Sequence, residues 1–347
     1  MSTFSVQPFG TTRDGREICE IVMEDAAGNR AHLINFGAAI RCLFVKDRDG
    51  QLRDVCLGYD SLGEYEEQNG CLGATMGRCT NRTANARVTL SGREYKLTEN
   101  RPGYHMHGGE VGFHKKVWDY EIVNDKVVFT YVSPDGEEGY PGTLTAKVLY
   151  SWSADGTLRI EYDCVSDRET VINLTNHSYF NLNGQESGEA LDHSLYIPHT
   201  LLADTDDNII SDGRTYDVTG TPLDFTELHT VGERIGADFA YLKKTGGYDH
   251  GYILPGGDMH TAAVLRSDKS GIELRCMTDL PDLGLYTANF LSPRKGKNDA
   301  QYAQFHGVCL ETQFVPNAAN LPAFSPKPVF AAGEHYRFKT DYIFKNF

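Results

Sequence analysis

The chain has little positive charge for its length of 347 residues. It contains 33 lysines and arginines against 48 aspartates and glutamates, which gives a formal net charge of −15 at pH 7. A chain of this sign lacks the positive field by which proteins bind phosphate backbones or anionic lipid surfaces. We therefore expect neither nucleic acid nor a membrane among its partners.

Long apolar runs are lacking as well. No stretch approaches the roughly 18 apolar residues of a membrane-spanning helix, and the start, MSTFSVQPFGTTRDG, has no basic segment followed by an apolar one. We therefore expect a cytoplasmic protein. The eight cysteines form no C-x-x-C pair. Their even number is compatible with disulfides, but a reducing cytosol favours free thiols.

Helical periodicity is scarce. Its best case follows Asp224, where Leu228, Val231 and Ile235 recur at three- and four-residue spacing and predict one short peripheral helix. No alternation of strands with helices indicates a parallel sheet. The chain also shows no glycine-rich phosphate loop and no activated-nucleophile motif.

Short β-prone segments separated by glycine make up most of the chain, which has 35 glycines. Residues 126–132, 143–153, 158–162 and 336–344 alternate with a period close to two, as strands do. No internal repeat or low-complexity linker divides the sequence. The pattern predicts an all-β fold, a single large antiparallel β-sandwich forming one domain over residues 1–347.

Strand parity places two ionisable residues on polar faces. Between Val308 and Val315, Glu311 shares a face with Cys309 and Gln313, opposite a more apolar face. By the same alternation, His177 lies with hydrogen-bonding and aromatic residues, namely Thr175, Tyr179 and Asn181. Such a face can line a groove for a small polar ligand. Taken singly, however, a strand glutamate is usually solvated, and a histidine is more often a surface or satisfied core residue.

The segment His105-Met-His107 raises the alternative of a metal site. On a strand, the two imidazoles would lie on one face, and Glu110 and His114 follow closely. Gly108-Gly109 indicates a turn rather than a continuing strand, and no second cluster with ligand spacing is present. We therefore expect no metal.

A series of motifs in one order resembles the aldose 1-epimerases, also called galactose mutarotases. The similarity runs almost from end to end. It is carried by Asn35-Phe-Gly-Ala38, Leu57-Gly-Tyr-Asp60, Asn81-Arg82, His107-Gly-Gly109, Asp135-Gly-Glu-Glu-Gly-Tyr-Pro-Gly142, Asn176-His-Ser-Tyr-Phe-Asn-Leu182, Thr221-Pro-Leu-Asp-Phe225, Tyr248-Asp-His250, Glu311-Thr-Gln313 and the C-terminal strand.

The resemblance implies a large twisted β-sandwich with an open sugar-binding cleft, no cofactor, and a monomer or homodimer. In such enzymes a glutamate matching Glu311 is the general base and a histidine matching His177 the general acid. Residues matching His107, Asp249 and the pair Asn81-Arg82 position the sugar. Family members often bring a glutamine from a strand before the segment that is here Tyr286 to Phe290, and residues 279–285 contain none.

These residue types suit anomer interconversion of galactose, glucose and similar aldopyranoses. A carboxylate base takes the proton of the C1 hydroxyl while an imidazolium acid protonates the ring oxygen, and the opened aldehyde turns and recloses. Three alternatives stay open. An epimerase of a phosphorylated hexose needs several cations around the phosphate, and among the motif residues Arg82 is the strong candidate. A glycoside hydrolase would use Asp249 and Glu311 as its two carboxyl groups. A non-catalytic carbohydrate-binding protein would have no need of an acid–base pair.

Overall fold

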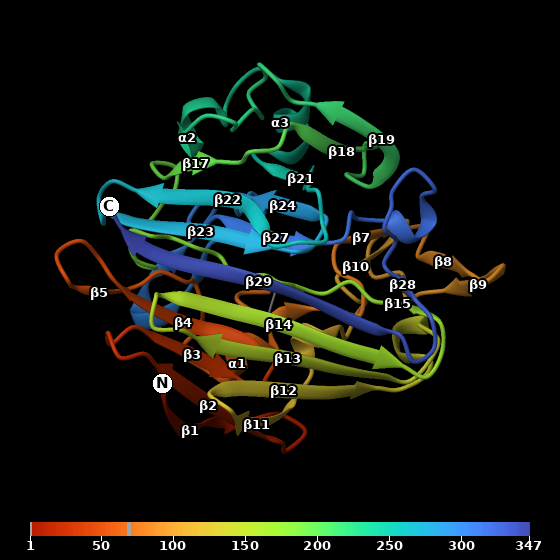
Figure 1. Ribbon diagram of the computed structural model, residues 1–347, viewed down its shortest axis with the longest axis horizontal. Coiled ribbons are helices and arrows are strands. Elements are labelled where there is room, and N and C mark those ends of the chain that lie inside the picture. The colour runs from red at the N-terminus through yellow and green to blue at the C-terminus, as the bar shows by residue number, and fades with distance from the viewer. Residues whose placement is uncertain (1, 68–70) are drawn as a thin grey trace.

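The computed structural model describes residues 2–67 and 71–347, and most of its regular structure is antiparallel β-sheet (Figure 1). The long alternating segments form these sheets because every second side chain is buried. Between Leu144 and Trp152, for example, buried and half-buried residues alternate without interruption. The predicted all-β sandwich is confirmed, and the four strands expected at 126–132, 143–153, 158–162 and 336–344 are all present.

The largest sheet has nine strands, and its central strand is the C-terminal one. β29 (His335–Asn346) pairs with β14 on one side and β23 on the other, and Figure 1 shows it crossing the middle of the molecule. In sheet order the strands are β11 (Asp119–Val123), β12 (Lys126–Ser133), β13 (Leu144–Trp152), β14 (Thr157–Ser166), β29, β23 (Ile272–Thr278), β22 (His260–Ser267), β17 (Ser194–Tyr196) and β20 (His229–Thr230).

Two five-stranded sheets pack with it. The first is formed by β1 (Thr3–Thr11), β2 (Glu17–Glu24), β3 (Arg30–Ile34), β4 (Ala39–Lys46) and β5 (Leu52–Asp54). The second has the order β19 (Ser211–Asp217), β18 (Leu201–Thr205), β21 (Asp249–Ile253), β24 (Asp282–Tyr286) and β27 (Cys309–Gln313). One hydrophobic cluster includes Leu33, Ile160 and Leu310, one from each of the three large sheets. Burial of apolar area in this cluster is what holds the three sheets together.

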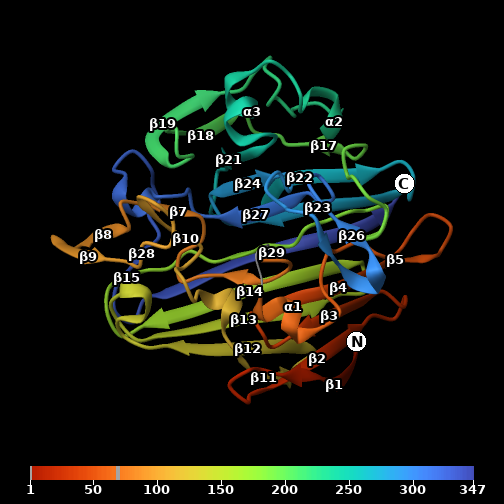
Figure 2. The same ribbon diagram turned by 180° about the vertical axis from the view of Figure 1, so that it is seen from behind.

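Short strand pairs connect these sheets and carry several of the motif segments (Figure 2). They are β7 (Arg82–Ala84) with β10 (Tyr104–Met106), β6 (Thr75–Met76) with β16 (Thr175–Asn176), β8 (Arg87–Leu90) with β9 (Arg93–Lys96), β15 (Thr170–Val171) with β28 (Val329–Phe330), and β25 (Arg294–Lys295) with β26 (Gln301–Tyr302).

Helices are short in the described ranges. They are α1 (Leu62–Glu66), α2 (Val231–Arg234) and α3 (Ala240–Thr245), with single 3-10 turns at 113–115, 137–139, 297–299 and 318–320. The predicted helix after Asp224 is present as α2, but it begins only at Val231, and Leu228 is exposed before it. Within residues 2–67 and 71–347 no helix is long and apolar enough to cross a membrane.

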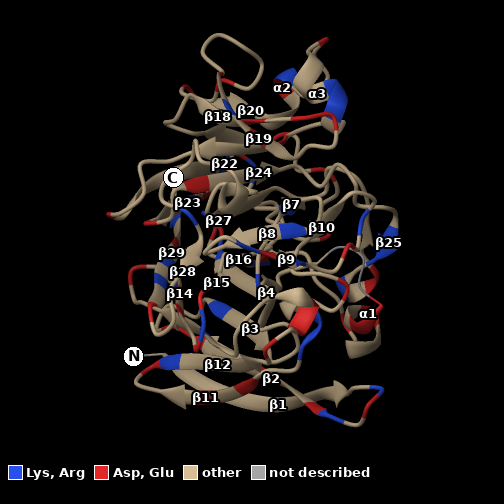
Figure 3. Ribbon diagram, turned by 90° about the vertical axis from the view of Figure 1, so that its right-hand side faces the viewer, with Lys and Arg blue, Asp and Glu red and all other residues tan. Residues whose placement is uncertain are grey.

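One composition-based expectation can be compared with the structure. All eight cysteines are free thiols, as expected. Acidic and basic positions are interspersed over the side of the molecule in Figure 3.

Candidate active site

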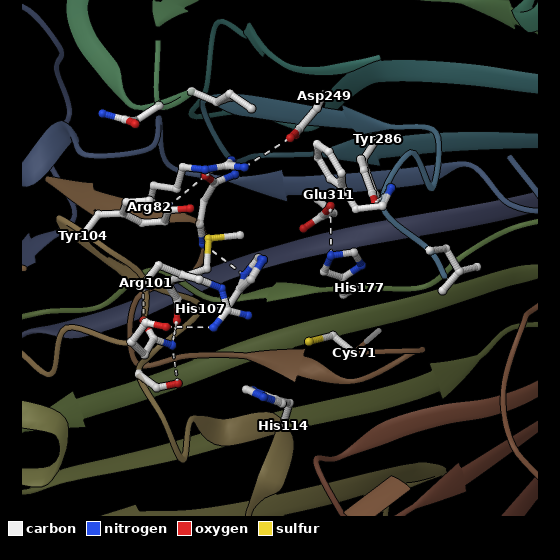
Figure 4. Close-up of a pocket in the computed structure, with 18 of the residues that line it drawn as sticks. Cys71, Arg82, Arg101, Tyr104, His107, His114, His177, Asp249, Tyr286 and Glu311 are labelled. Atoms are coloured by element: carbon white, nitrogen blue, oxygen red, sulfur yellow. Dashed lines mark hydrogen bonds and ion pairs between the residues drawn. The ribbon is translucent and has the colours of Figure 1, made fainter. Parts of the chain in front are cut away.

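A cleft of about 530 Å³ brings together all six residues that the sequence singled out for a site. Five of the six, all but Asn81, are labelled in Figure 4, where their side chains come from different parts of the fold and converge on one space. Arg82 begins β7, Asp249 begins β21 and Glu311 is the middle residue of β27, whereas Asn81, His107 and His177 lie in connecting segments. The cleft therefore depends on long-range packing of the sheets.

Glu311 and His177 lie next to each other in the cleft. The Nε2 atom of His177 lies 3.5 Å from Oε1 of Glu311, and each side chain is only 7% exposed. Among the described residues, neither Glu311 Oε2 nor His177 Nδ1 has a hydrogen-bond partner. The pair thus has free polar atoms that a ligand in the cleft can bind.

Strand parity explains the orientation of Glu311 but only part of that of His177. Leu310 packs in the main hydrophobic cluster while Glu311 lines the cleft, as the alternation predicted. The strand that carries Asn176 ends at that residue, so alternation does not continue through the motif. Tyr179 does stack on His177, with ring centroids 5.0 Å apart, but Thr175 and Asn181 are buried and do not line the cleft.

Arg82 and Asp249 form an ion pair at one wall of the cleft. Arg82 Nη2 donates to Asp249 Oδ2 at 3.3 Å, with the side chains 8% and 16% exposed respectively. Asn81 adopts a left-handed backbone (φ 58°), and its Oδ1 accepts a hydrogen bond from the Arg82 amide at 2.8 Å. This turn fixes the direction in which the guanidinium leaves the backbone.

His107 enters the cleft because the chain turns sharply at this residue. Its φ is +50°, and Gly108 follows in a position where a Cβ atom would lie 1.7 Å from the carbonyl oxygen of Gly77. Only glycine fits such an approach. The Asn81 amide donates to Nδ1 of His107 at 3.2 Å, so Nε2 carries the proton of the neutral ring.

Of the four residues that suggested a metal site, His105 lies apart from the other three. His105 is fully buried away from the cleft, where Nδ1 donates to the Thr98 carbonyl and Nε2 accepts from the Tyr140 hydroxyl, both at 2.7 Å. His114 and Glu110 line the cleft with His107. In the part of the chain that the structure describes, the ligand-type atoms that gather within 4.8 Å of one another belong to His177, Cys309 and Glu311.

The family model described as aldose 1-epimerase matches residues 20–343, nearly the whole chain. The chain belongs to the aldose 1-epimerase family. Among curated relatives, the galactose mutarotase of Sus scrofa is 37% identical over 338 residues, covering 97% of each chain. The aldose 1-epimerase of Escherichia coli strain K12 is 32% identical over 335 residues, covering 95% of this chain and 96% of that one.

Solved structures agree with the sequence relatives. Galactose 1-epimerase from Lactobacillus acidophilus superposes with a TM-score of 0.87 at 26% identity, covering 100% of this chain and 99% of that chain. The aldose epimerase homologue from C. elegans gives a TM-score of 0.86 at 27% identity with the same coverage. The fold that the motif resemblance implied is thus the fold of this aldose 1-epimerase family member.

Burial dominates the electrostatics of the epimerase cleft. It raises the pKa of Glu311 well above its usual value, and the nearby carboxylate of Asp249 adds to the shift. Burial also lowers the pKa of His177 to about 4. The expected imidazolium is therefore disfavoured in the unliganded site, where both shifts favour uncharged side chains.

Several lining residues were not singled out from the sequence. Tyr286 and Phe290 stack with ring centroids 6.3 Å apart, and Phe290 is among the most exposed large apolar residues described. Arg101, Lys115 and the turn at 207–209 between β18 and β19 also reach the cleft. Aromatic residues next to a sugar-binding motif can be suspected of contacting the sugar from the sequence alone. A hairpin turn carries no such local signal that it belongs to a site.

The glutamine that the resemblance implied is not replaced from the same strand. β24 reads Asp282-Leu-Gly-Leu-Tyr286, and Gly284 is the residue paired directly with Glu311. Gln313 lies nearby on β27, but its amide donates to Asp282 Oδ2 at 3.0 Å and the residue does not line the cleft. The place beside Glu311 is therefore free of a side chain from β24.

Proposed function

We propose that this protein is an aldose 1-epimerase that interconverts the α and β anomers of galactose, glucose and similar aldopyranoses. The observation that carries the proposal is the neighbouring pair Glu311 and His177, 3.5 Å apart in a cleft of about 530 Å³ that has room for a hexose. Membership of the family and the names of the relatives support the same activity.

In the proposed reaction Glu311 is the base and His177 the acid. Glu311 accepts the proton of the C1 hydroxyl, and His177 gives a proton to the ring oxygen O5. The electron pair of the O1–H bond forms the carbonyl as the C1–O5 bond breaks. The open-chain aldehyde then turns about C1–C2, and the reverse proton transfers close the ring with either configuration.

The opposite pKa shifts of Glu311 and His177 affect which of the two groups carries the proton that they share. Raising the pKa of Glu311 and lowering that of His177 leaves one proton on the two groups together at intermediate pH. The reactive form, with a carboxylate and an imidazolium, has the same number of protons. Transfer within the pair therefore generates it without proton exchange with solvent, once sugar hydroxyls replace the missing hydrogen bonds.

The other motif residues are proposed to position the sugar. His107 presents an N–H donor at Nε2, and the pair Arg82 and Asp249 offers a donor and an acceptor on one wall. Such paired groups suit vicinal hydroxyls. The rings of Tyr286 and Phe290 offer an apolar surface for the C–H face of the sugar.

The alternative of a phosphorylated hexose gains one specific observation. Besides Arg82, which is paired, Arg101 and Lys115 line the cleft and could face a phosphate. The single-domain organisation over residues 1–347, a monomeric or homodimeric state, cytoplasmic location and the absence of nucleic acid or membrane partners stay predictions.

Polarimetry tests the proposal directly. Freshly dissolved α-galactose, α-glucose and α-glucose 6-phosphate are followed to equilibrium with and without the protein. Faster equilibration of the unmodified hexoses supports the proposal, whereas acceleration of the phosphate ester alone supports the alternative. No acceleration of any of the three contradicts both.

A further inference from the structure

A second, small cavity opens directly beside Glu311. It has a volume of about 30 Å³ and adjoins the main cleft, with which it shares Arg82, Asp249 and Glu311. Its remaining walls include Gly251 on β21, Gly284 on β24 and Ser211 on β19, all from the same five-stranded sheet. About 10–15 Å³ by this measure holds one water, so the cavity has room for two or three heavy atoms.

The cavity exists because two glycines lie in register with the base. Gly251 pairs with Gly284, and Gly284 pairs with Glu311, so the three residues share one face of the sheet. Neither glycine has a positive φ. The atoms nearest to a Cβ atom at Gly284 would be the Gln313 amide nitrogen at 3.1 Å and Glu311 atoms at 3.5 Å. Backbone geometry therefore does not require glycine at 284, and its effect is to leave space.

Polar atoms without protein partners line that space. Ser211 Oγ and Glu311 Oε2 have none among the described residues, and both side chains are more than nine-tenths buried. His250 follows Asp249 on β21 and by strand alternation lies on the other face of the sheet, where its ring is near that of Tyr241. The Ser211 hydroxyl is thus a buried donor that can bind a polar group such as a carbonyl oxygen.

The position of the cavity relative to a bound sugar rests on the proposed function. The anomeric carbon carries O1, O5 and C2. In the ring, C1 and its oxygen O1 lie between O5 and C2. If His177 is at O5 and Glu311 at O1, a space on the far side of Glu311 from His177 therefore faces C2. Glu311 lines both spaces, whereas His177 lines only the main cleft. The small cavity therefore lies on the C2 side.

We propose that this cavity is a subsite for an acyl group on C2, and that 2-acylamino-2-deoxyaldoses such as N-acetylglucosamine are substrates. An acetyl group adds three heavy atoms, which match the volume, and its carbonyl oxygen accepts from Ser211 Oγ–H. The reaction needs no further reactant, because the same proton transfers at O1 and O5 open and close the ring.

The test compares two sugars on one enzyme. Anomer exchange of galactose and of N-acetylglucosamine is measured by NMR or polarimetry, and the ratio of kcat/KM for the two is the readout. Gly284→Gln fills the cavity and is expected to lower the relative rate on N-acetylglucosamine by at least about tenfold, as steric exclusion from a fitted pocket does. Gly284→Ala and Ser211→Ala are expected to lower it less. Gly236→Ala, at a glycine with open space around it, is the matched control.

The outcomes of this experiment distinguish failure of the acyl subsite from failure of the proposed epimerase function. Exchange of both sugars by the wild type, with a ratio that falls in the Gly284 and Ser211 variants but not in Gly236→Ala, supports the subsite. Acceleration of galactose without N-acetylglucosamine, or a ratio unchanged in all Gly284 and Ser211 variants, overturns it and leaves the proposed function standing. Failure on galactose itself overturns the proposed function.

Discussion

Replacing Asp249 by Asn removes one charge of the ion pair in the cleft and leaves Arg82 nearly buried without it. At the observed 3.3 Å, two unit charges attract by about 5 kcal/mol at an effective dielectric constant of about 20, before desolvation is subtracted. Loss of one partner of a buried pair typically costs about 3–5 kcal/mol. Asp249 is 16% exposed and Asn keeps an acceptor oxygen, so we expect the free energy of unfolding to fall by about 2–3 kcal/mol.

Urea unfolding at pH 7, followed by the fluorescence of the buried Trp118 and Trp152, measures this change. The surface pair Arg87 and Glu94 has nearly the same separation, 3.2 Å, but both side chains are more than half exposed. Glu94→Gln is therefore the matched control and should cost less than about 1 kcal/mol. If Asp249→Asn destabilises the protein no more than Glu94→Gln, the claim that burial makes this pair strong is wrong.

Three further outcomes are expected. His177→Asn should lower kcat by about a hundredfold or more, as loss of a general acid does, whereas His107→Asn should mainly raise KM; an unchanged kcat and pH profile for the first would refute its assignment. Activity should survive prolonged dialysis against EDTA, and stoichiometric zinc or manganese whose removal abolishes turnover would overturn the mechanism. Because the pKa of Glu311 is raised in the folded state, stability that is fully present below about pH 4.5 should be lost as pH rises through the folded pKa. Glu311→Gln has no carboxyl group to ionise and should not show that loss. The free energy of unfolding of the variant minus that of the wild type, measured in urea, should therefore rise between pH 4 and pH 8, and a constant difference contradicts the pKa shift of Glu311.

Local patterns were sufficient to predict four long strands of the largest sheet and the orientation of Glu311. Alternation decides both, because the period of a strand follows from its backbone and the apolar face must be buried. The orientation of His177 was harder to predict. The strand before it ends at Asn176, so side-chain alternation does not continue to His177, and its ring stacks on that of Tyr179. Its role was suggested by the motif resemblance and not by periodicity.

Contacts between distant segments could not be predicted from residue patterns. Arg82 and Asp249 are 167 residues apart, and nothing in either segment indicates that they pair. His105 and His107 looked equivalent in the sequence, yet a left-handed turn at His107 sends their rings to different places. The cavity beside Glu311 depends on the register of Gly251 with Gly284, which is known only once three strands are aligned.

Mutarotation by Glu311→Gln tests the central claim most directly. Glutamine preserves the shape of the side chain but cannot accept the proton of the C1 hydroxyl. We expect the catalysed rate of α-galactose equilibration, measured by polarimetry at saturating sugar, to fall at least about a hundredfold while the urea unfolding transition stays cooperative. A folded Glu311→Gln variant with near-normal turnover would contradict the account.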